Sequence, residues 1–144
     1  MRAATRIPAD TGLAPLARIA LAVEIVATYA RVRWTLRRQG LPRTLKELRD
    51  ASGSGPAGAP DAPVATGRRL GRAVVRTLSL LPADSRCLMR SLVLTRLLAR
   101  RGIETRLVIA VSPGERFAAH AWIEHGDAPL LPAGAPAFEQ LVTL

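Results

Sequence analysis

Mainly apolar residues recur at helical spacing through the first third of the chain. The positions of one helix face, at steps of four, three and four, are Leu21, Ile25, Thr28 and Val32. This pattern predicts a long helix over residues 15–39. Two arginines followed by Gly40 predict its end, since cations in the last turn and a glycine after it are typical of a helix C-terminus. The capping-box pattern of Thr44 and Glu47 predicts the start of a short second helix.

A segment rich in glycine, proline, serine and alanine follows. Residues 50–66 read DASGSGPAGAPDAPVAT, a composition that forms no hydrophobic core and is typical of a flexible linker. The chain therefore divides into an N-terminal helical part, residues 1–49, and a C-terminal part, residues 67–144.

The C-terminal part begins with two further predicted helices. The first has helically spaced apolar residues and is stopped by Pro82; these residues are Leu70, Val74, Val75, Leu78 and Leu81. Asp84 or Ser85 can then cap a second helix that ends at Gly102. One face of that helix carries, at steps of four, three and four, Cys87, Ser91, Leu94 and Leu98.

The period then changes from helix to strand. Residues 106–111 are rich in branched side chains and predict a buried strand, and residues 117–125 predict a second strand. Gly126 and Asp127 predict a two-residue hairpin turn into a short third strand over residues 128–131. The remaining tail is expected to dock on the body through Phe138 and other apolar residues. Helices followed by an antiparallel hairpin indicate the α+β class.

Charge and composition narrow the partners. The net charge is +10, and Lys46 is the only lysine, so arginine supplies nearly all of the positive charge. Such a chain favours acidic partners. The arginines are scattered, however, and aromatic residues are few, so direct nucleic-acid binding is not expected.

The most apolar stretch, residues 19–30, contains Glu24 and is well below the ~20 residues needed to cross a bilayer. We expect it to be a buried helix, with no transmembrane segment. The one cysteine permits no internal disulfide, and no spacing suggests a metal site, so no metal is expected and a reducing, cytoplasmic setting is favoured.

Cys87 is placed where a thiolate would be stabilised. Unpaired backbone N–H groups and the positive end of the helix dipole lie in the first turn of a helix. A nucleophilic cysteine also needs a base, and His120, in the middle of the second predicted strand, is the candidate. The alternative is that Cys87 is a small apolar filler and His120 an ordinary core or surface residue.

The local sequence around these two residues resembles that of the transglutaminase-like leader peptidases of lasso-peptide biosynthesis. The match is specific over about residues 70–131. The residues that carry it are Pro82, Ser85, Cys87, Leu88, Ser91, Gly102, Phe117, His120, Ala121, Trp122 and Glu124. The N-terminal helix resembles the front end of the family more loosely.

The resemblance implies a small transglutaminase/papain-like core, a helix carrying Cys87 packed on a short antiparallel sheet carrying His120. It implies a cysteine protease that removes the leader from a ribosomally made lasso-peptide precursor. The implied partners are that precursor, a leader-binding recognition protein and an ATP-dependent cyclase of asparagine-synthetase type. The chain has no phosphate-binding glycine loop, so no cofactor is expected, and we expect the cyclase to bind the ATP.

One position departs from the family pattern. The family carries a third catalytic residue, an aspartate, on the strand after the histidine, and Pro132 stands there in this chain. With the predicted hairpin, Glu124 and Asp127 lie roughly 13 Å and 23 Å along the strand from His120, too far to replace it. The orienting role is therefore vacant, filled by a backbone carbonyl, or taken by Glu139 in the tail.

Two other function classes stay open. Without the third residue, the chain is alternatively a non-catalytic scaffold that docks the precursor or the cyclase. An acyltransferase of the same fold would pass the acyl group to an amine instead of water.

Overall fold

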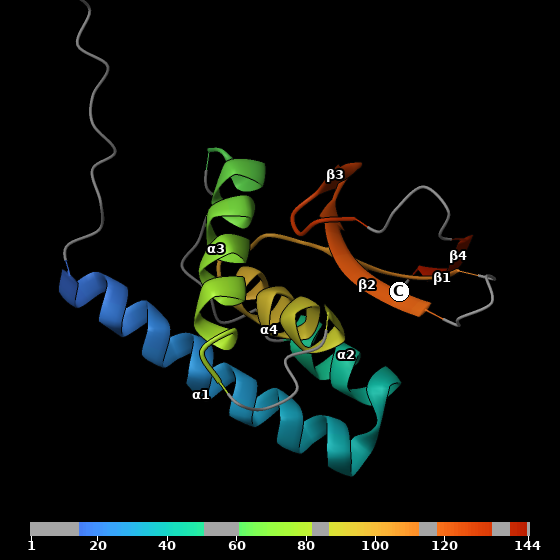
Figure 1. Ribbon diagram of the computed structural model, residues 1–144, viewed down its shortest axis with the longest axis horizontal. Helices are drawn as coiled ribbons and strands as arrows, with labels where there is room; N and C mark the ends of the chain where they lie inside the picture. Colours follow the sequence, from blue (N-terminus) through green and yellow to red (C-terminus); the bar gives the residue numbers. More distant parts are fainter. Residues whose placement is uncertain (1–14, 51–60, 82–86, 113–117, 134–138, 144) are drawn as a thin grey trace, which may run out of the picture.

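In the described part of the chain, four helices precede a four-stranded antiparallel sheet, which confirms the expected α+β class (Figure 1). The computed structural model describes residues 15–50, 61–81, 87–112, 118–133 and 139–143. The elements in chain order are α1 (Pro15–Gln39), α2 (Leu41–Asp50), α3 (Pro63–Leu78), α4 (Cys87–Ala99), β1 (Arg106–Ser112), β2 (Ala118–His125), β3 (Ala128–Pro129) and β4 (Glu139–Thr143).

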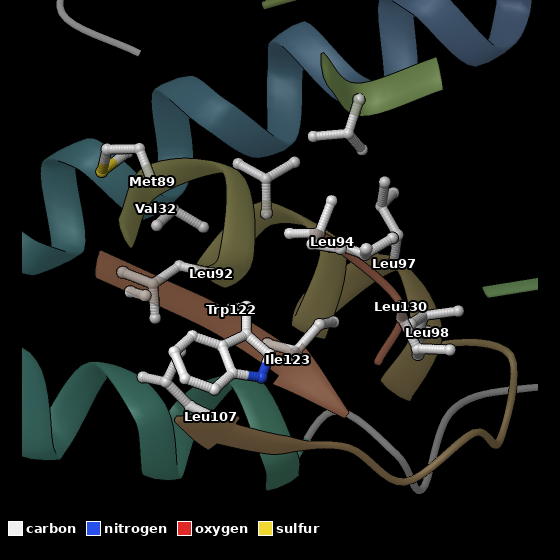
Figure 2. Close-up of a cluster of buried hydrophobic side chains, with 14 of the residues drawn as sticks. Val32, Met89, Leu92, Leu94, Leu97, Leu98, Leu107, Trp122, Ile123 and Leu130 are labelled. Carbon is white, nitrogen blue, oxygen red and sulfur yellow. The ribbon is translucent and has the colours of Figure 1, made fainter. Parts of the chain in front are cut away.

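Helix α4 lies at the centre of the molecule. It contacts α1, α2 and α3 and also packs on β2 (Figure 1). Nine of its 13 residues are buried, and its leucines join Leu107 of β1 and Ile123 of β2 in one hydrophobic cluster (Figure 2). A helix that is apolar almost all round is stable in water only when other elements cover it, and here three helices and the sheet do so.

Helix α1 has the predicted bounds but is buried along only one face. Ile25 and Val32 are fully buried, as the spacing predicted, whereas Ile19 is 60% exposed and Val23 is 63% exposed. The expectation that residues 19–30 form a buried helix is therefore wrong for its outward face. The contacts of α1 with α3 and α4 cover the opposite face and leave these side chains in solvent.

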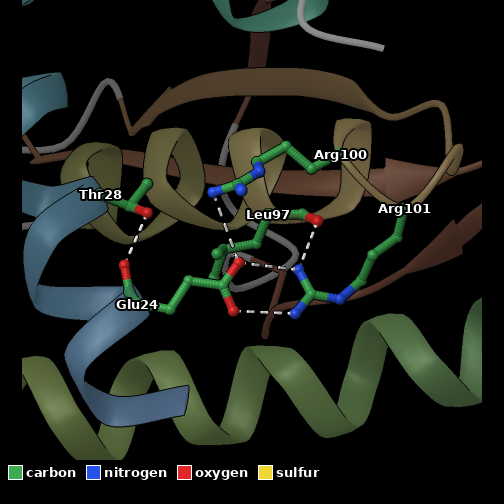
Figure 3. Close-up of polar contacts among 5 residues, drawn as sticks. All are labelled: Glu24, Thr28, Leu97, Arg100 and Arg101. Atoms are coloured by element: carbon green, nitrogen blue, oxygen red, sulfur yellow. Dashed lines mark hydrogen bonds and ion pairs between the residues drawn. The ribbon is translucent and has the colours of Figure 1, made fainter. Parts of the chain in front are cut away.

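An ion-pair cluster fastens α1 to the end of α4. The Glu24 carboxylate accepts a hydrogen bond of 3.0 Å from Arg101 and lies 3.7 Å from an Arg100 nitrogen (Figure 3). Arg101 also donates to the Leu97 carbonyl at 2.8 Å, and Thr28 donates to the Glu24 carbonyl at 2.7 Å. The carboxylate that interrupts the apolar run of α1 is thus paired and hydrogen-bonded, as a half-buried charge requires.

Helix α2 begins earlier than the capping-box pattern predicted. Gly40 adopts φ +75°, which ends α1, and α2 starts at Leu41. Thr44 therefore lies inside the helix, where its hydroxyl donates to the Gly40 carbonyl at 2.8 Å. A hydroxyl can bond backward to a carbonyl four residues earlier as readily as it caps a helix start, so the predicted N-terminus was wrong by one turn.

Helices α2 and α3 extend into the two ends of the predicted linker, residues 50–66. Asp50 is the last residue of α2, and α3 begins at Pro63. Proline is well tolerated in the first turn of a helix, where its missing N–H would have no partner. Residues 51–60 lie outside the described part of the chain. Helices from both sides of this segment contribute to a single hydrophobic core.

The sheet has the strand order β3-β2-β1-β4. The hairpin at Gly126, whose φ is +58°, is confirmed, and His125 pairs with Ala128 as expected. Only Ala128–Pro129 of the predicted third strand is strand. The tail differs more, because β4 lies antiparallel to β1 as an edge strand of the sheet, where the sequence predicted only a docked tail.

No helix in the described residues is long and apolar enough to cross a membrane.

Two glycines let α3 approach the segment that follows β3. A Cβ at Gly71 would lie 2.7 Å from the Leu130 backbone oxygen, and a Cβ at Gly67 would lie 2.8 Å from a terminal methyl of the Leu130 side chain. The backbone of residues 130–131 thus rests directly on α3. The same segment leads into Pro132, which is part of the candidate site described below.

We expect Gly71→Ala to lower the free energy of unfolding by about 1–3 kcal/mol, because the new methyl meets backbone that cannot move away alone. Gly67→Ala is the matched control. There the methyl meets the flexible end of a leucine, and the alanine adds helix propensity of up to about 1 kcal/mol. Urea unfolding of both variants measures the difference, and equal stability of the two would contradict the close approach at Gly71.

Candidate active site

Cys87 is the first residue of α4 and is half-buried. It therefore lies in the first turn, whose backbone N–H groups have no acceptor within the helix. Asp84 and Ser85, the predicted capping residues, lie outside the described residues. The expectation that the only thiol of the chain sits at a helix start is confirmed by the bounds of α4.

His120 lies on β2, the strand that packs on α4. The Ser91 hydroxyl donates to the Ala121 carbonyl at 3.2 Å, and both groups are buried. Ser91 is one helical turn, about 6 Å, beyond Cys87, and Ala121 directly follows His120. This bond therefore holds the first half of α4 against the part of β2 that carries His120.

The imidazole of His120 is oriented by a backbone carbonyl. Its Nε2 lies 2.9 Å from the Pro132 oxygen. A carbonyl can only accept a hydrogen bond, so Nε2 carries the hydrogen and the neutral ring has its lone pair on Nδ1. Pro132, which stands where the resemblance implied an aspartate, thus supplies an acceptor through its main chain. The predicted hairpin places this segment beside His120, so it was the feature of the sequence from which this acceptor could have been predicted.

A second contact holds the face of the ring. The His120 and Trp122 rings stack with centroids 5.7 Å apart and planes inclined by 25°. The Trp122 indole N–H donates to Glu124 at 2.8 Å, and Arg106 donates to the other oxygen of Glu124, also at 2.8 Å. His120, Trp122 and Glu124 alternate along β2, so they share one face of the strand. Together they form a supporting row that ends at the Arg106–Glu124 ion pair.

Hydrogen bonds within the supporting row lower the pKa of Glu124. Partial burial by itself would raise the pKa of Glu124, but the hydrogen bonds from Arg106 and Trp122 outweigh it and hold the pKa below its ordinary value. Glu124 accepts a hydrogen bond from Trp122, whose ring stacks on that of His120. Its exclusion as the direct orienting group, expected from strand spacing, agrees with these contacts.

Glu139 lies on β4, on the far side of β1 from β2. In the backbone register Glu139 is opposite Val111, whereas His120 is opposite Ala110. Glu139 is therefore one residue out of the row that contains His120 and two strands away from it. Its side chain lies outside the described part of the structure, and its orienting role stays a hypothesis.

His125 occupies the other face of β2 from His120, since the two are five residues apart on a strand. Its Nδ1 donates to the Glu104 carbonyl at 2.7 Å. It lines a shallow hollow of about 270 Å³ with Glu104, Arg106 and Glu124 at the hairpin end of the sheet. The two histidines therefore have different hydrogen-bond acceptors, Pro132 for His120 and Glu104 for His125.

No cluster of three or more histidine, cysteine, aspartate or glutamate side chains is placed to hold a metal ion among the described residues.

Comparison with known proteins agrees with this geometry. The family model described as the transglutaminase-like superfamily matches residues 25–143. The chain therefore belongs to the transglutaminase-like superfamily, which includes cysteine peptidases and acyltransferases. The match extends over the helices on both sides of the 51–60 segment and over all four strands. Searches of curated proteins and of solved structures found no significant match.

The depressed pKa of Glu124 predicts a pH-dependent contribution to stability. A carboxylate whose pKa is lower in the folded than in the unfolded chain stabilises the fold above its unfolded pKa of about 4.3, and this stabilisation is lost as the pH falls through the lower folded value. We expect Glu124→Gln to unfold at a lower temperature than wild type at about pH 7, with the difference shrinking below about pH 4. Thermal unfolding across this pH range tests it, and a difference that is constant with pH would contradict it.

Proposed function

We propose that the chain is a cysteine peptidase in which Cys87 is the nucleophile and His120 the general base. The observation that carries the proposal is the hydrogen bond from His120 Nε2 to the Pro132 carbonyl. With the hydrogen on Nε2, the lone pair on Nδ1 is the one that would accept the thiol proton. The strand that carries His120 is held against α4 by the Ser91–Ala121 hydrogen bond.

The proposed reaction has two halves. In the first, His120 Nδ1 takes the proton of the Cys87 thiol, and the sulfur attacks the carbonyl carbon of the scissile peptide bond. The oxyanion accepts a hydrogen bond from the backbone N–H of Cys87, which lies in the first turn of α4. As the C–N bond breaks, the imidazolium returns its proton to the leaving amine and a thioester remains.

In the second half, water replaces the amine. His120 removes a proton from the water as it attacks the thioester, and the proton then returns to the departing sulfur. The Pro132 carbonyl accepts from Nε2 throughout, so it favours the imidazolium form during both transfers. It contributes a dipole instead of the full charge of a carboxylate, so we expect slower turnover than a carboxylate-oriented pair would give.

The proposed substrate is a lasso-peptide precursor, cleaved between leader and core. The support for this substrate is the local sequence around Cys87 and His120, which resembles that of the leader peptidases of lasso-peptide biosynthesis. On this proposal the enzyme works in the cytoplasm with a leader-binding recognition protein that presents the precursor. An ATP-dependent asparagine-synthetase-like cyclase then closes the ring, and the peptidase itself needs no cofactor.

We expect Cys87→Ala to abolish release of the leader and His120→Ala to lower the rate by at least about a thousandfold, since each removes a member of the pair. His125→Ala is the matched control and should retain most of the activity, because that ring faces away from the pair. Mass spectrometry of the precursor, with the recognition protein present, measures all three. Full activity of Cys87→Ala would refute the peptidase, and amine adducts in place of the free acid would indicate the acyltransferase.

We further expect Glu139→Gln to leave the cleavage rate within about twofold of wild type, because the Pro132 carbonyl already accepts from Nε2. Single-turnover kinetics of the variant and of wild type provide the measurement. A drop of tenfold or more, equivalent to ~1.4 kcal/mol of barrier, would instead assign the orienting role to the carboxylate of Glu139.

A further inference from the structure

A groove separates the first half of α1 from α3. It has a volume of about 730 Å³ and reaches Arg101, just after α4. In Figure 1 the two helices cross at one end and diverge toward the start of each. Much of its lining is apolar, with Leu21 on α1 and Leu70 and Ala73 on α3, and none of its lining residues is aromatic.

Arginines line the groove on both sides. Arg69, Arg72 and Arg76 succeed one another on α3 at steps of three and four residues, so they form one stripe about 10 Å long. Arg18 faces them from α1. All four side chains are exposed, and none makes an ion pair with a carboxylate of the described residues.

Among the described residues that line the groove, one is a carboxylate, and its charge is already compensated. Glu24, a lining residue of the groove, pairs with both Arg100 and Arg101 (Figure 3). The stripe on α3 therefore presents cations to solvent beside an apolar surface, and no carboxylate of the described residues pairs with them.

We propose that this groove binds an acidic, amphipathic helical segment of another polypeptide. Carboxylates at steps of three and four residues would lie along the arginine stripe, and guanidinium groups bind carboxylates through two parallel hydrogen bonds. Apolar side chains on the adjacent face of the segment would enter the groove between α1 and α3. The combination of spacing, charge and apolar lining thus matches one kind of occupant.

The other anionic partners fit less well. A flat bilayer surface does not enter a concave site between two helices. A nucleic acid would use the arginines but leave the apolar lining unused, and the lining has no aromatic ring on which a base could stack.

The groove also points toward the start of α4. It follows α3 from Thr66 to Leu80, and Ser79 beside that end accepts a hydrogen bond of 3.3 Å from Arg90 in the first turn of α4. Cys87 is not among the described residues that line the groove. Binding itself requires no cleavage, so Cys87→Ala should bind as wild type does, whatever the outcome for the proposed peptidase.

The test uses a short fluorescent helical peptide with glutamates spaced three and four residues apart and leucines on the adjacent face. Fluorescence anisotropy compares wild type with the double variant Arg72→Glu, Arg76→Glu. The matched control is Arg37→Glu, Arg43→Glu, which makes the same change in charge at exposed residues away from the groove. Thermal unfolding of each variant shows that it is folded.

We expect saturable binding to wild type that weakens with salt, a loss of at least about tenfold in affinity for the groove variant, and less than about twofold for the control. Peptides with glutamine for glutamate or serine for leucine should bind weakly. The proposal is overturned by any of three results: no saturable binding to wild type, equal losses in the two double variants, or tighter binding of anionic vesicles or single-stranded DNA than of the peptide.

Discussion

The burial of α4 is the constraint on which the rest of the structure depends. A helix with leucine or valine on nearly every face cannot stay in water, so α1, α2 and α3 and the sheet must all cover it. That packing fixes where the helix starts, and the start is where Cys87 lies. Deep burial also explains why Ser91 can reach the Ala121 carbonyl, because a buried hydroxyl needs an acceptor and the adjacent strand supplies one.

Both direct contacts and more distant packing hold the candidate site in place. The Pro132 carbonyl fixes the tautomer of His120, and Trp122 holds the face of the ring. Behind these contacts, the close approach of α3 at Gly71 sets the backbone that leads into Pro132. On the proposed function, a main-chain carbonyl held in place by the packing of the fold would therefore orient the catalytic histidine, as a carboxylate does in other sites.

Much of this could be predicted from the sequence, and the misses have physical reasons. Helical spacing located α1 and α3, and the glycine turn gave the hairpin and the place of His120. The β4 strand was missed because its partner β1 is some thirty residues earlier, and pairing over that separation leaves no local pattern. The orienting group was left open because every residue has a carbonyl, so the sequence alone does not single out that of Pro132.

The central claim is that Cys87 and His120 act as one pair, and the single thiol of the chain makes it directly measurable. The rate of Cys87 alkylation by iodoacetamide at about pH 6, followed by intact mass, should fall at least about tenfold in His120→Ala and stay near the wild-type rate in His125→Ala. Equal alkylation rates in all three proteins would contradict the pair and leave Cys87 as an ordinary half-buried thiol at the start of a helix.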